Sequence, residues 1–515
     1  MELDFLPIPL TWVLLAALSV LFYLYCMRPM NMLKKMGIPH PKPLPVIGNM
    51  HQTMKTGVWN PDAQVERINK FGAVYGSYMG RTVYITISDP EMLREVFVKQ
   101  FHKFTNRAPD GQSLNIKPSC RMMTQLVDED WKNVRSTLSP AFSGGKLKHM
   151  SEAMNTCADV LLKNLGKFAE KGESFDSKDL TSGFTTDVIA RTAFGLEVDS
   201  QGNPEDPFVV YTRKPFAVAF RNPLFWLFFL FPKIMKPILE FFEYSFLDKD
   251  VSSFFYNVVD QVMGMRQTED KAHRHVDFMQ LMMNAHKEDD DDDNKEEGTQ
   301  VQGTKQPLTR DDIVANGFLF FIAGYETTAT TMGFLLYNLA LHQEAQDKAR
   351  EEINQVMEGR ELVDYEAVNK MSYLEMCIHE TLRMYSPASG VVRVVGDEVK
   401  MKWLTLKKGM NVMIPILGIH NDPKRWPEPK KFIPERFTKE EREKRDQYDW
   451  LPFGAGPRNC IGMRLALMEL KVGVARVLRK YRIVPGPDTD IPLKIMKWKQ
   501  FPTPENGIKL RVELL

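Results

Sequence analysis

The chain has 515 residues with a formal net charge of +1, and 43% of its residues are hydrophobic, which is enough for a large core. This balanced charge argues against a nucleic-acid partner or a strongly acidic one. The five cysteines are scattered without a CxxC pair, which argues against a disulfide framework or a zinc ribbon and indicates a reducing compartment.

The N-terminus differs from that of a soluble protein. Residues 5–27 carry no charge, and about 20 apolar residues are enough to span a bilayer. Arg28, Lys34 and Lys35 follow directly, so the positive-inside rule places the rest of the chain in the cytoplasm. A cleavable signal peptide is the alternative, but the leading end has no basic region. We therefore predict an uncleaved transmembrane anchor at residues 1–27.

A proline-rich hinge is predicted at residues 28–50, because four prolines alternate there and favour a stiff polyproline-like linker. The remaining chain, residues 51–515, is predicted to be one large domain. Alternating apolar residues around a Gly-Arg turn predict a β-hairpin at 73–90, and a second group of strands is expected at 391–416.

Two stretches of the middle region stand out by composition. Residues 224–231 (LFWLFFLF) are too short to span a membrane, and two interpretations stay open, a buried core helix or a contact with the membrane surface. Residues 286–306 contain an acidic run followed by a polar tract, which predicts a solvated loop.

A long central helix is expected next. Thr309 and Asp312 have capping-box spacing, and no proline follows through Glu344, so the helix would be about 50 Å long. It is apolar on nearly all sides, which predicts that it is buried through the middle of the molecule. Because helical patterns dominate around a few strands, the fold class is mainly α with small β-sheets (α+β).

The densest chemical pattern is WLPFGAGPRNCIG at 450–462. Cys460 stands on a turn that enters a helix, where the helix dipole and free amides are expected to lower its pKa. Three glycines (Gly454, Gly456 and Gly462) allow the backbone to close around the sulfur, and Arg458 adds positive charge. Inert packing and a nucleophile with a distant histidine are alternatives. A lone thiolate held by amides fits an axial metal ligand better.

With this motif the chain resembles the cytochrome P450 enzymes. Phe453, Gly456, Arg458, Cys460 and Gly462 match the family's F-x-x-G-x-R-x-C-x-G haem-ligand loop. Four other motifs follow the family order: Trp131-x-x-x-Arg135, the AGYETT sequence at 323–328, Glu380-x-x-Arg383, and PERF at 434–437. FTNR at 104–107 and SGGKLK at 143–148 are most similar to the microsomal drug- and steroid-oxidising branch that includes thromboxane synthase.

The resemblance implies a cytochrome P450 fold, with the long helix over haem b and residues 51–515 as the haem-binding catalytic domain. Cys460 would be the axial iron ligand. Glu380, Arg383 and Arg436 would form a buried structural triad. The expected cofactor-binding residues are Trp131, Arg135, Arg393, Arg458, Phe453, Gly456, Gly462 and Ala323, with Arg107 as a weaker candidate.

The implied function is a monooxygenase that uses O₂ on a lipophilic substrate such as a xenobiotic, a steroid or a fatty-acid-like molecule. Thr327 and Glu326 would be catalytic, delivering protons. The chain has no dinucleotide-binding motif, so NADPH-cytochrome P450 reductase would supply electrons, with cytochrome b5 as an additional donor. Basic residues near the cysteine, namely Lys132, Arg464 and Lys471, would receive that partner. The expected location is the endoplasmic reticulum membrane, single-pass, with the catalytic domain cytoplasmic.

The substrate pocket is expected to include Phe318, Phe321, Ala388 and Val392, the loop around 108–126 and the tip at 496–499. Small residues at 388–390 indicate room above the iron, and large aromatic residues indicate apolar ligands. Two rival functions stay open. One is a haem-thiolate isomerase that rearranges an endoperoxide without a reductase, and the other is a non-catalytic membrane protein that binds haem or lipid.

Overall fold

Helices make up most of the chain, and three small sheets lie among them in the computed structural model, which describes residues 10–107, 114–203, 205–213, 222–268, 277–286 and 307–515. This is the mainly helical α+β architecture that the sequence predicts. The helices are α1 (Leu10–Met27), α2 (Met32–Lys35), α3 (Met50–Thr56), α4 (Pro61–Phe71), α5 (Pro90–Arg94), α6 (Asp128–Leu138), α7 (Gly144–Lys171), α8 (Ser177–Ile189), α9 (Pro207–Arg213), α11 (Pro223–Leu230), α12 (Pro232–Phe241), α13 (Lys249–Thr268), α14 (Phe278–His286), α15 (Arg310–Leu341), α16 (Gln343–Val356), α17 (Tyr365–Lys370), α18 (Ser372–Met384), α19 (Ile416–Asn421), α20 (Lys439–Glu443) and α21 (Met463–Lys480).

The largest sheet joins two segments that lie far apart in the sequence. Strands β1 (Val74–Met79) and β2 (Thr82–Ile87) form the hairpin predicted at 73–90. Strand β2 also runs parallel to β7 (Asn411–Ile414), which pairs antiparallel with the edge strand β4 (Val391–Val394). The smaller sheets consist of β3 (Phe175–Asp176), β9 (Lys509–Leu514) and β8 (Tyr481–Pro485), and of β5 (Val399–Met401) and β6 (Leu404–Leu406).

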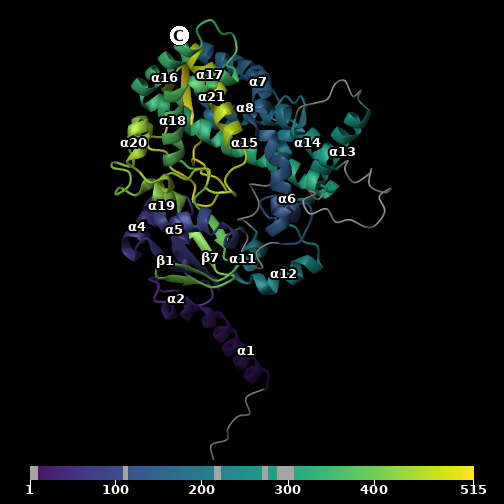
Figure 1. Cartoon of the computed structure of the whole chain (residues 1–515), viewed down its shortest axis with the longest axis vertical. Coiled ribbons are helices and arrows are strands. Elements are labelled where there is room, and N and C mark those ends of the chain that lie inside the picture. Colours follow the sequence, from purple (N-terminus) through teal and green to yellow (C-terminus); the bar gives the residue numbers. More distant parts are fainter. Residues whose placement is uncertain (1–9, 108–113, 204, 214–221, 269–276, 287–306) are drawn as a thin grey trace, which may run out of the picture.

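Helix α15 lies among α8, α18 and α21 in the helical part of the molecule (Figure 1). Thr309 and Asp312 form the predicted capping box. The helix ends at Leu341 rather than at Glu344, because His342 leaves the helical conformation, with φ −120° and ψ 76°. Its 32 residues correspond to about 48 Å. Most of its side chains are buried, as its apolar circumference predicts.

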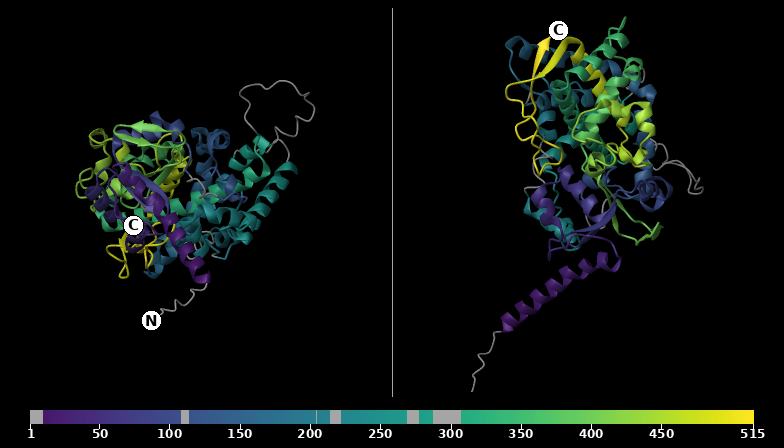
Figure 2. Two further views of the ribbon diagram at one scale, coloured as in Figure 1. Left: turned by 90° about the horizontal axis from the view of Figure 1, so that it is seen from below. Right: turned by 90° about the vertical axis from the view of Figure 1, so that its left-hand side faces the viewer.

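Helix α1 extends beyond the folded body, as the right-hand view of Figure 2 shows. Residues Leu10–Lys35 form a helical stretch that is long and apolar enough to cross a membrane, judged by length and composition. Most side chains of α1 are exposed. Residues 1–9, which include the start of the predicted span, lie outside the described residues. An exposed apolar helix of this length fits a bilayer better than water.

Residues 28–50 pack against the sheet and do not form a free polyproline-like linker. The chain continues from α1 as a 3₁₀ turn at Arg28–Asn31 and then as α2. Met30 and Leu33 are buried in the same apolar cluster as the sheet. The Tyr78 hydroxyl donates to the Met30 carbonyl at 2.9 Å and accepts from the Leu33 amide at 3.0 Å. These contacts fix the point from which α1 leaves the body.

The apolar run at 224–231 forms α11, in which only Phe228 is buried, so the interpretation as a buried core helix does not hold. Helix α12 follows, and Phe241 and Phe242 at its end are 81% and 71% exposed. The rings of Phe231 and of Phe22 on α1 lie 5.8 Å apart. Both helices therefore lie at the end of the molecule from which α1 projects (Figure 1).

The loop that carries Cys460 lies at the junction of two apolar clusters. Phe453 and Ile461 pack against the helical cluster around α15. Leu451 and Ala455 belong to or pack against the cluster built on the sheet. The position of the cysteine therefore depends on how both clusters assemble.

A buried charge triad stabilises this junction. Arg383 on α18 donates to both carboxylate oxygens of Glu380 at 2.7 and 2.8 Å. Arg436, on a 3₁₀ turn at Pro434–Phe437, donates to the same carboxylate at 3.2 Å. Glu380 and Arg383 have no exposed surface. Because water does not reach these two side chains, each charge has to be compensated by a partner inside the protein.

The triad is connected to the start of the cysteine loop. Arg383 also donates to the His420 carbonyl at 2.9 Å, and the His420 ring accepts the Leu451 amide at 2.7 Å. The indole of Trp450 donates to the His379 carbonyl at 3.2 Å. Because His379 and Arg383 both belong to α18, this helix holds the triad and the loop together.

Arg383→Ala is expected to destabilise the protein by about 3–5 kcal/mol, because it leaves the Glu380 carboxylate buried without its main partner. Thermal unfolding measures the effect. Arg360→Ala is the control, since it removes a half-exposed ion pair with Asp364 and should cost less than about 1 kcal/mol. An Arg383→Ala protein with wild-type stability would contradict a stabilising role for the triad.

Candidate functional site

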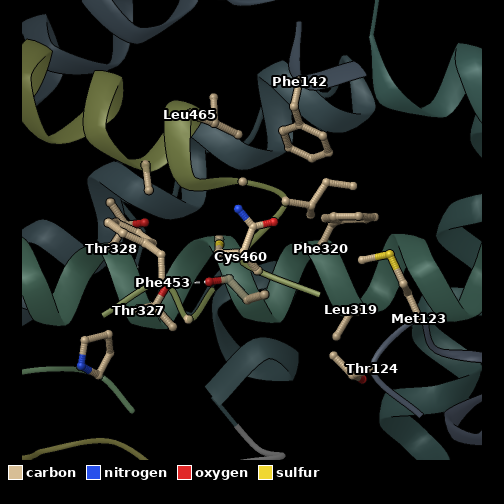
Figure 3. Close-up of a pocket in the computed structure, with 18 of the residues that line it drawn as sticks. Met123, Thr124, Phe142, Leu319, Phe320, Thr327, Thr328, Phe453, Cys460 and Leu465 are labelled. Carbon is tan, nitrogen blue, oxygen red and sulfur yellow. Dashed lines mark hydrogen bonds between the residues drawn. The ribbon is translucent and has the colours of Figure 1, made fainter. Parts of the chain in front are cut away.

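A cavity of about 370 Å³ lies between α15 and the loop that carries Cys460. Figure 3 shows Cys460 among side chains of this cavity that include Thr327, Leu319 and Phe320. Its volume and its largely apolar lining are typical of a site for a small molecule. The sequence-predicted residues that line it are Ala323, Thr327, Trp131, Arg135, Arg393, Arg458, Phe453, Gly462, Ala388, Cys460 and Arg107.

Backbone geometry holds the cysteine loop in a tight conformation. The Cys460 amide donates to the Phe453 carbonyl at 2.9 Å. Gly454 and Gly456 have φ values of 68° and 70°, in the left-handed region that favours glycine. A Cβ on Gly456 would lie 2.0 Å from the Phe97 carbonyl oxygen. Gly456 therefore allows close packing of the loop. We expected it to contact the cofactor, but it does not line the cavity.

The Cys460 thiol is surrounded by protein, yet its surface is accessible because it faces the open cavity. Burial raises its pKa above the ordinary value, while the Gly462 amide and the guanidinium groups of Arg135 and Arg107 act in the opposite direction. We expected the helix N-terminus to lower this pKa. The removal of water outweighs that effect, because a buried site disfavours the charged thiolate. A bound metal cation reverses this balance, since it deprotonates a coordinating thiol.

Four arginines gather at one side of the cavity without a carboxylate partner. Within the part of the chain that the structure describes, none of Arg107, Arg135, Arg393 and Arg458 forms an ion pair with an acidic side chain. Burial lowers the pKa of Arg393 and of Arg458 to about 9, and nearby arginines add to the effect. So much uncompensated positive charge favours the binding of an anion.

The arginines also present unused donors. Arg107 Nε, Arg393 Nε and two nitrogens of Arg458 are buried without a hydrogen-bond partner among the described residues. The Arg458 guanidinium lies 4.3 Å from the centre of the Trp131 ring. Arg135 differs, because it donates to the carbonyl and side-chain oxygens of Asn459 at 3.0 Å and so also supports the cysteine loop. Unsatisfied buried donors are rare in proteins and indicate a ligand with acceptor oxygens.

Helix α15 contributes one wall. The Thr327 hydroxyl donates to the Ala323 carbonyl at 2.6 Å, and both residues line the cavity. Helix α15 stays regular at this position. Thr327 is therefore a polar group on an intact helical wall.

Phe318 and Phe321 do not line the cavity, which corrects our expectation. Both are buried against other aromatic residues, with Phe255 in contact with each. Leu319 and Phe320 line the cavity instead. Each residue of a helix turns by about 100°, so positions 319 and 320 share the face of Ala323 and Thr327. Counting about 100° per residue from Ala323 along the sequence would have predicted that Leu319 and Phe320 face the cavity.

Strand β4 corrects a second expectation. Val391 and Arg393 line the cavity, whereas Val392 does not. Side chains alternate between the two faces of a strand, so neighbours of Val391 and Arg393 point away. Ala388, before the strand, lines the cavity as expected.

Glu326 faces a different space from Thr327, since adjacent residues of a helix lie about 100° apart. Its carboxylate is 2.5 Å from Lys178 Nζ on α8, and both side chains are largely buried. Both residues line a second cavity of about 330 Å³. Phe501 lines both cavities and forms part of the wall between them. The two adjacent residues thus face different spaces.

Other lining residues come from segments with no recognisable motif. The part of the 108–126 loop that is described contributes Met123 and Thr124, while residues 108–113 lie outside the described residues. Phe142 and Phe501 also line the cavity, and Phe501 does so in place of the tip expected at 496–499. Composition alone did not distinguish these residues from other apolar positions.

The basic residues expected to receive a partner are not equivalent. Lys471 is buried and bonded to Glu375 at 2.6 Å, so it is not available at the surface, contrary to our expectation. Lys132 is exposed beside Glu129, and Arg464 is exposed on the first turn of α21. Lys132 and Arg464 therefore remain as surface charges near the cysteine loop.

Comparisons with known proteins agree with this geometry. The sequence profile described as Cytochrome P450 matches residues 38–512. Cytochrome P450 3A6 of Oryctolagus cuniculus is 40% identical over 503 residues, covering 98% of this chain and 96% of the relative. Cytochrome P450 3A13 of Mus musculus, over 503 residues, and cytochrome P450 3A5 of Homo sapiens, over 504, are each 38% identical with the same coverage.

Proposed function

The chain belongs to the cytochrome P450 family and is a cytochrome P450 monooxygenase, and on that premise we propose that it inserts one oxygen atom from O₂ into a lipophilic substrate. The substrate class is a steroid, a xenobiotic or a fatty-acid-like molecule. Electrons come from NADPH through a separate reductase. The observation that carries this proposal is the apolar cavity that combines Cys460 with four arginines, none of which forms an ion pair among the described residues.

The residues present fit a haem group. Haem has two carboxylates, and the unpaired donors of Arg107, Arg393 and Arg458 are the chemical complement of such anions. Cys460 would supply the axial thiolate. Phe453, Gly462 and Ala323 line the space without charged groups. Haem bound through a thiolate supplies O₂ activation, because the sulfur donates electron density that favours O–O cleavage.

Thr327 and Glu326 have separate roles in proton delivery. The Thr327 hydroxyl lies at the cavity wall, and its one proton donates to the Ala323 carbonyl; when the hydroxyl rotates away from that carbonyl, it can donate into the cavity. Glu326 exchanges protons with the second cavity, where Lys178 holds its carboxylate. The wall at Phe501 limits the entry of other water into an otherwise apolar site. The separation of the two cavities favours proton transfer while bulk water stays out of the cavity with Cys460.

The electron donor docks on the side of the cysteine loop. The chain contains no dinucleotide-binding motif, so the reducing equivalents come from another protein. Lys132 and Arg464 offer exposed positive charge for an acidic partner such as NADPH-cytochrome P450 reductase or cytochrome b5.

The protein is placed in the endoplasmic reticulum membrane by α1, with the catalytic domain in the cytoplasm. Helix α12 adds a second contact, since Ile234, Ile238, Phe241 and Phe242 are exposed apolar residues at the same end of the molecule. Phe231 touches Phe22 of α1, which brings both elements to one membrane surface.

Turnover with purified NADPH-dependent reductase separates this function from its rivals. The monooxygenase consumes NADPH and O₂ when a steroid such as progesterone is added. An endoperoxide isomerase converts its substrate without NADPH or reductase. A non-catalytic carrier of haem or lipid forms no product under either condition.

Cys460→His is expected to abolish the strongly red-shifted Soret band of the reduced carbon monoxide complex, because that band requires a thiolate ligand. Absorption spectra of the full-length protein measure it. Cys120→Ser is the control, since Cys120 lies outside the cavity and its loss should leave the band unchanged. Persistence of the band in Cys460→His would show that another residue binds the iron.

Thr327→Val is expected to lower product formed per NADPH consumed by about tenfold or more, because proton donation at the cavity is lost. The ratio of product to hydrogen peroxide measures this uncoupling. Thr331→Val serves as the matched control, because Thr331 makes the same hydrogen bond to the preceding turn but does not line the cavity. Equal ratios for both variants would contradict the assigned role of Thr327.

Removal of residues 1–27 is expected to leave the haem spectrum unchanged while the protein still binds phospholipid vesicles through α12. Combining the deletion with Phe241→Ser and Phe242→Ser should release it, because the apolar face of α12 is then interrupted. Vesicle sedimentation measures binding. Equal sedimentation of both proteins would contradict a membrane contact at α12.

A further inference from the structure

One wall of the substrate cavity has little regular structure of its own. Residues 114–127 contain only a 3₁₀ turn at Ser119–Arg121, yet Met123 and Thr124 line the cavity. Figure 3 shows these two side chains beside Leu319 of α15. Because the segment lacks the hydrogen-bond ladder of a helix or strand, its position depends on what holds it at each end.

Asn316 of α15 holds one end of this wall. Its side-chain oxygen accepts the Met123 amide at 2.9 Å. Its side-chain nitrogen donates to the Arg121 carbonyl at 3.3 Å and to the Asp312 carbonyl at 2.8 Å. Asn316 has no exposed surface and does not line the cavity. A polar side chain in a buried apolar helix is costly unless satisfied, and here the wall satisfies it.

Charge pairs reinforce this contact at the first turns of α15. Arg121 donates to the Asp312 carboxylate at 2.8 Å, and the Asp312 side chain is almost fully buried. Lys117 lies 2.5 Å from Asp311, which also accepts the Tyr256 hydroxyl at 3.0 Å. Burial of Asp312 makes its pair stronger than an exposed one, since water screens it less.

The other end of the wall is held beside the arginine cluster. Arg458 donates to the Leu126 carbonyl at 2.6 Å. Asn106 and Asp128 exchange hydrogen bonds at 3.0 Å just beyond it. Only two residues lie between the anchors at Met123 and Leu126. The Leu126 amide also donates a hydrogen bond to the Met122 carbonyl at 2.9 Å. The side chains of Met123 and Thr124 therefore have little freedom relative to α15.

We propose that Asn316 is a positioning residue for substrate: it fixes Met123 and Thr124 at the cavity and thereby sets which lipophilic molecules fit and how fast they exchange. Arg121 acts with it through Asp312. The inference rests on the proposed function for the identity of the substrate. The placement of the wall itself does not depend on that function.

The test compares Asn316→Leu with Asn338→Leu in the haem-loaded full-length protein. Asn338 is an equally buried asparagine of α15, but it donates to Thr381 of α18, far from the wall. Hydrogen exchange of residues 114–127 measures the wall directly and needs no catalysis. Dissociation of 4-phenylimidazole and of progesterone, followed by absorption, measures ligand exchange.

Asn316→Leu is expected to raise hydrogen exchange in residues 114–127 and to speed dissociation of progesterone by about tenfold, because about two net hydrogen bonds to the wall are lost. The Michaelis constant should rise more than the turnover number falls, and the distribution of hydroxylated products should change. Asn338→Leu should lower overall stability but should change neither hydrogen exchange in residues 114–127 nor the dissociation of progesterone. Unchanged exchange in residues 114–127, or the same change in both variants, would overturn the proposal.

Arg121→Gln provides a second test if Asn316→Leu fails to fold, because Arg121 is partly exposed and easier to replace. Arg310→Gln is its control. Arg310 is also at the start of α15, and its replacement removes only an exposed ion pair with Asp260 of α13. Arg121→Gln should raise hydrogen exchange of the wall at low salt, and added salt should narrow the difference from wild type. A change of equal size in Arg310→Gln would overturn the role of Arg121. If the wild-type protein shows no turnover while the variants loosen the wall as expected, that result would count against the proposed function alone.

Discussion

The arrangement of this protein depends on positive charge that is buried without a counter-charge among the residues that the structure describes. Arg107, Arg393 and Arg458 keep donors free at one side of the cavity, while the Cys460 thiol faces the same space. Such a site is unfavourable by itself, because buried charges and donors lose their hydration. A group that carries carboxylates and a metal cation removes both costs at once, so cofactor binding and folding stability are linked.

A second layer of charge is fully compensated and keeps the first in place. Glu380 and Arg383 lie together with no exposed surface, and the same helix holds the residues before the cysteine loop through His379. Arg135 contacts Asn459 within that loop. The site thus combines a closed structural network on one side with an open network that is completed by a ligand on the other.

The walls of the cavity on the substrate side are held by helix packing and polar contacts rather than by the arginine cluster. Helix α15 is regular and mostly buried, and it presents Thr327 to this cavity and Glu326 to the second one. The opposite wall at 114–127 is irregular, and polar contacts from Asn316 and Asp312 hold it to that helix. The regular helix with the proposed catalytic groups and the irregular wall held to it by polar contacts together keep the shape of the cavity constant around the site.

The sequence by itself determined the family, the long apolar helix, the capping box at Thr309 and the positions of Cys460, Glu380 and Arg383, because these depend on local spacing and periodicity. Only the tertiary structure decided which faces meet. It placed Leu319 and Phe320, not Phe318 and Phe321, at the cavity, turned Val392 away, buried Lys471 and separated Glu326 from Thr327. It also raised the pKa of Cys460 through burial. These outcomes depend on which neighbours pack against each side chain, and such contacts join residues that are distant in the sequence.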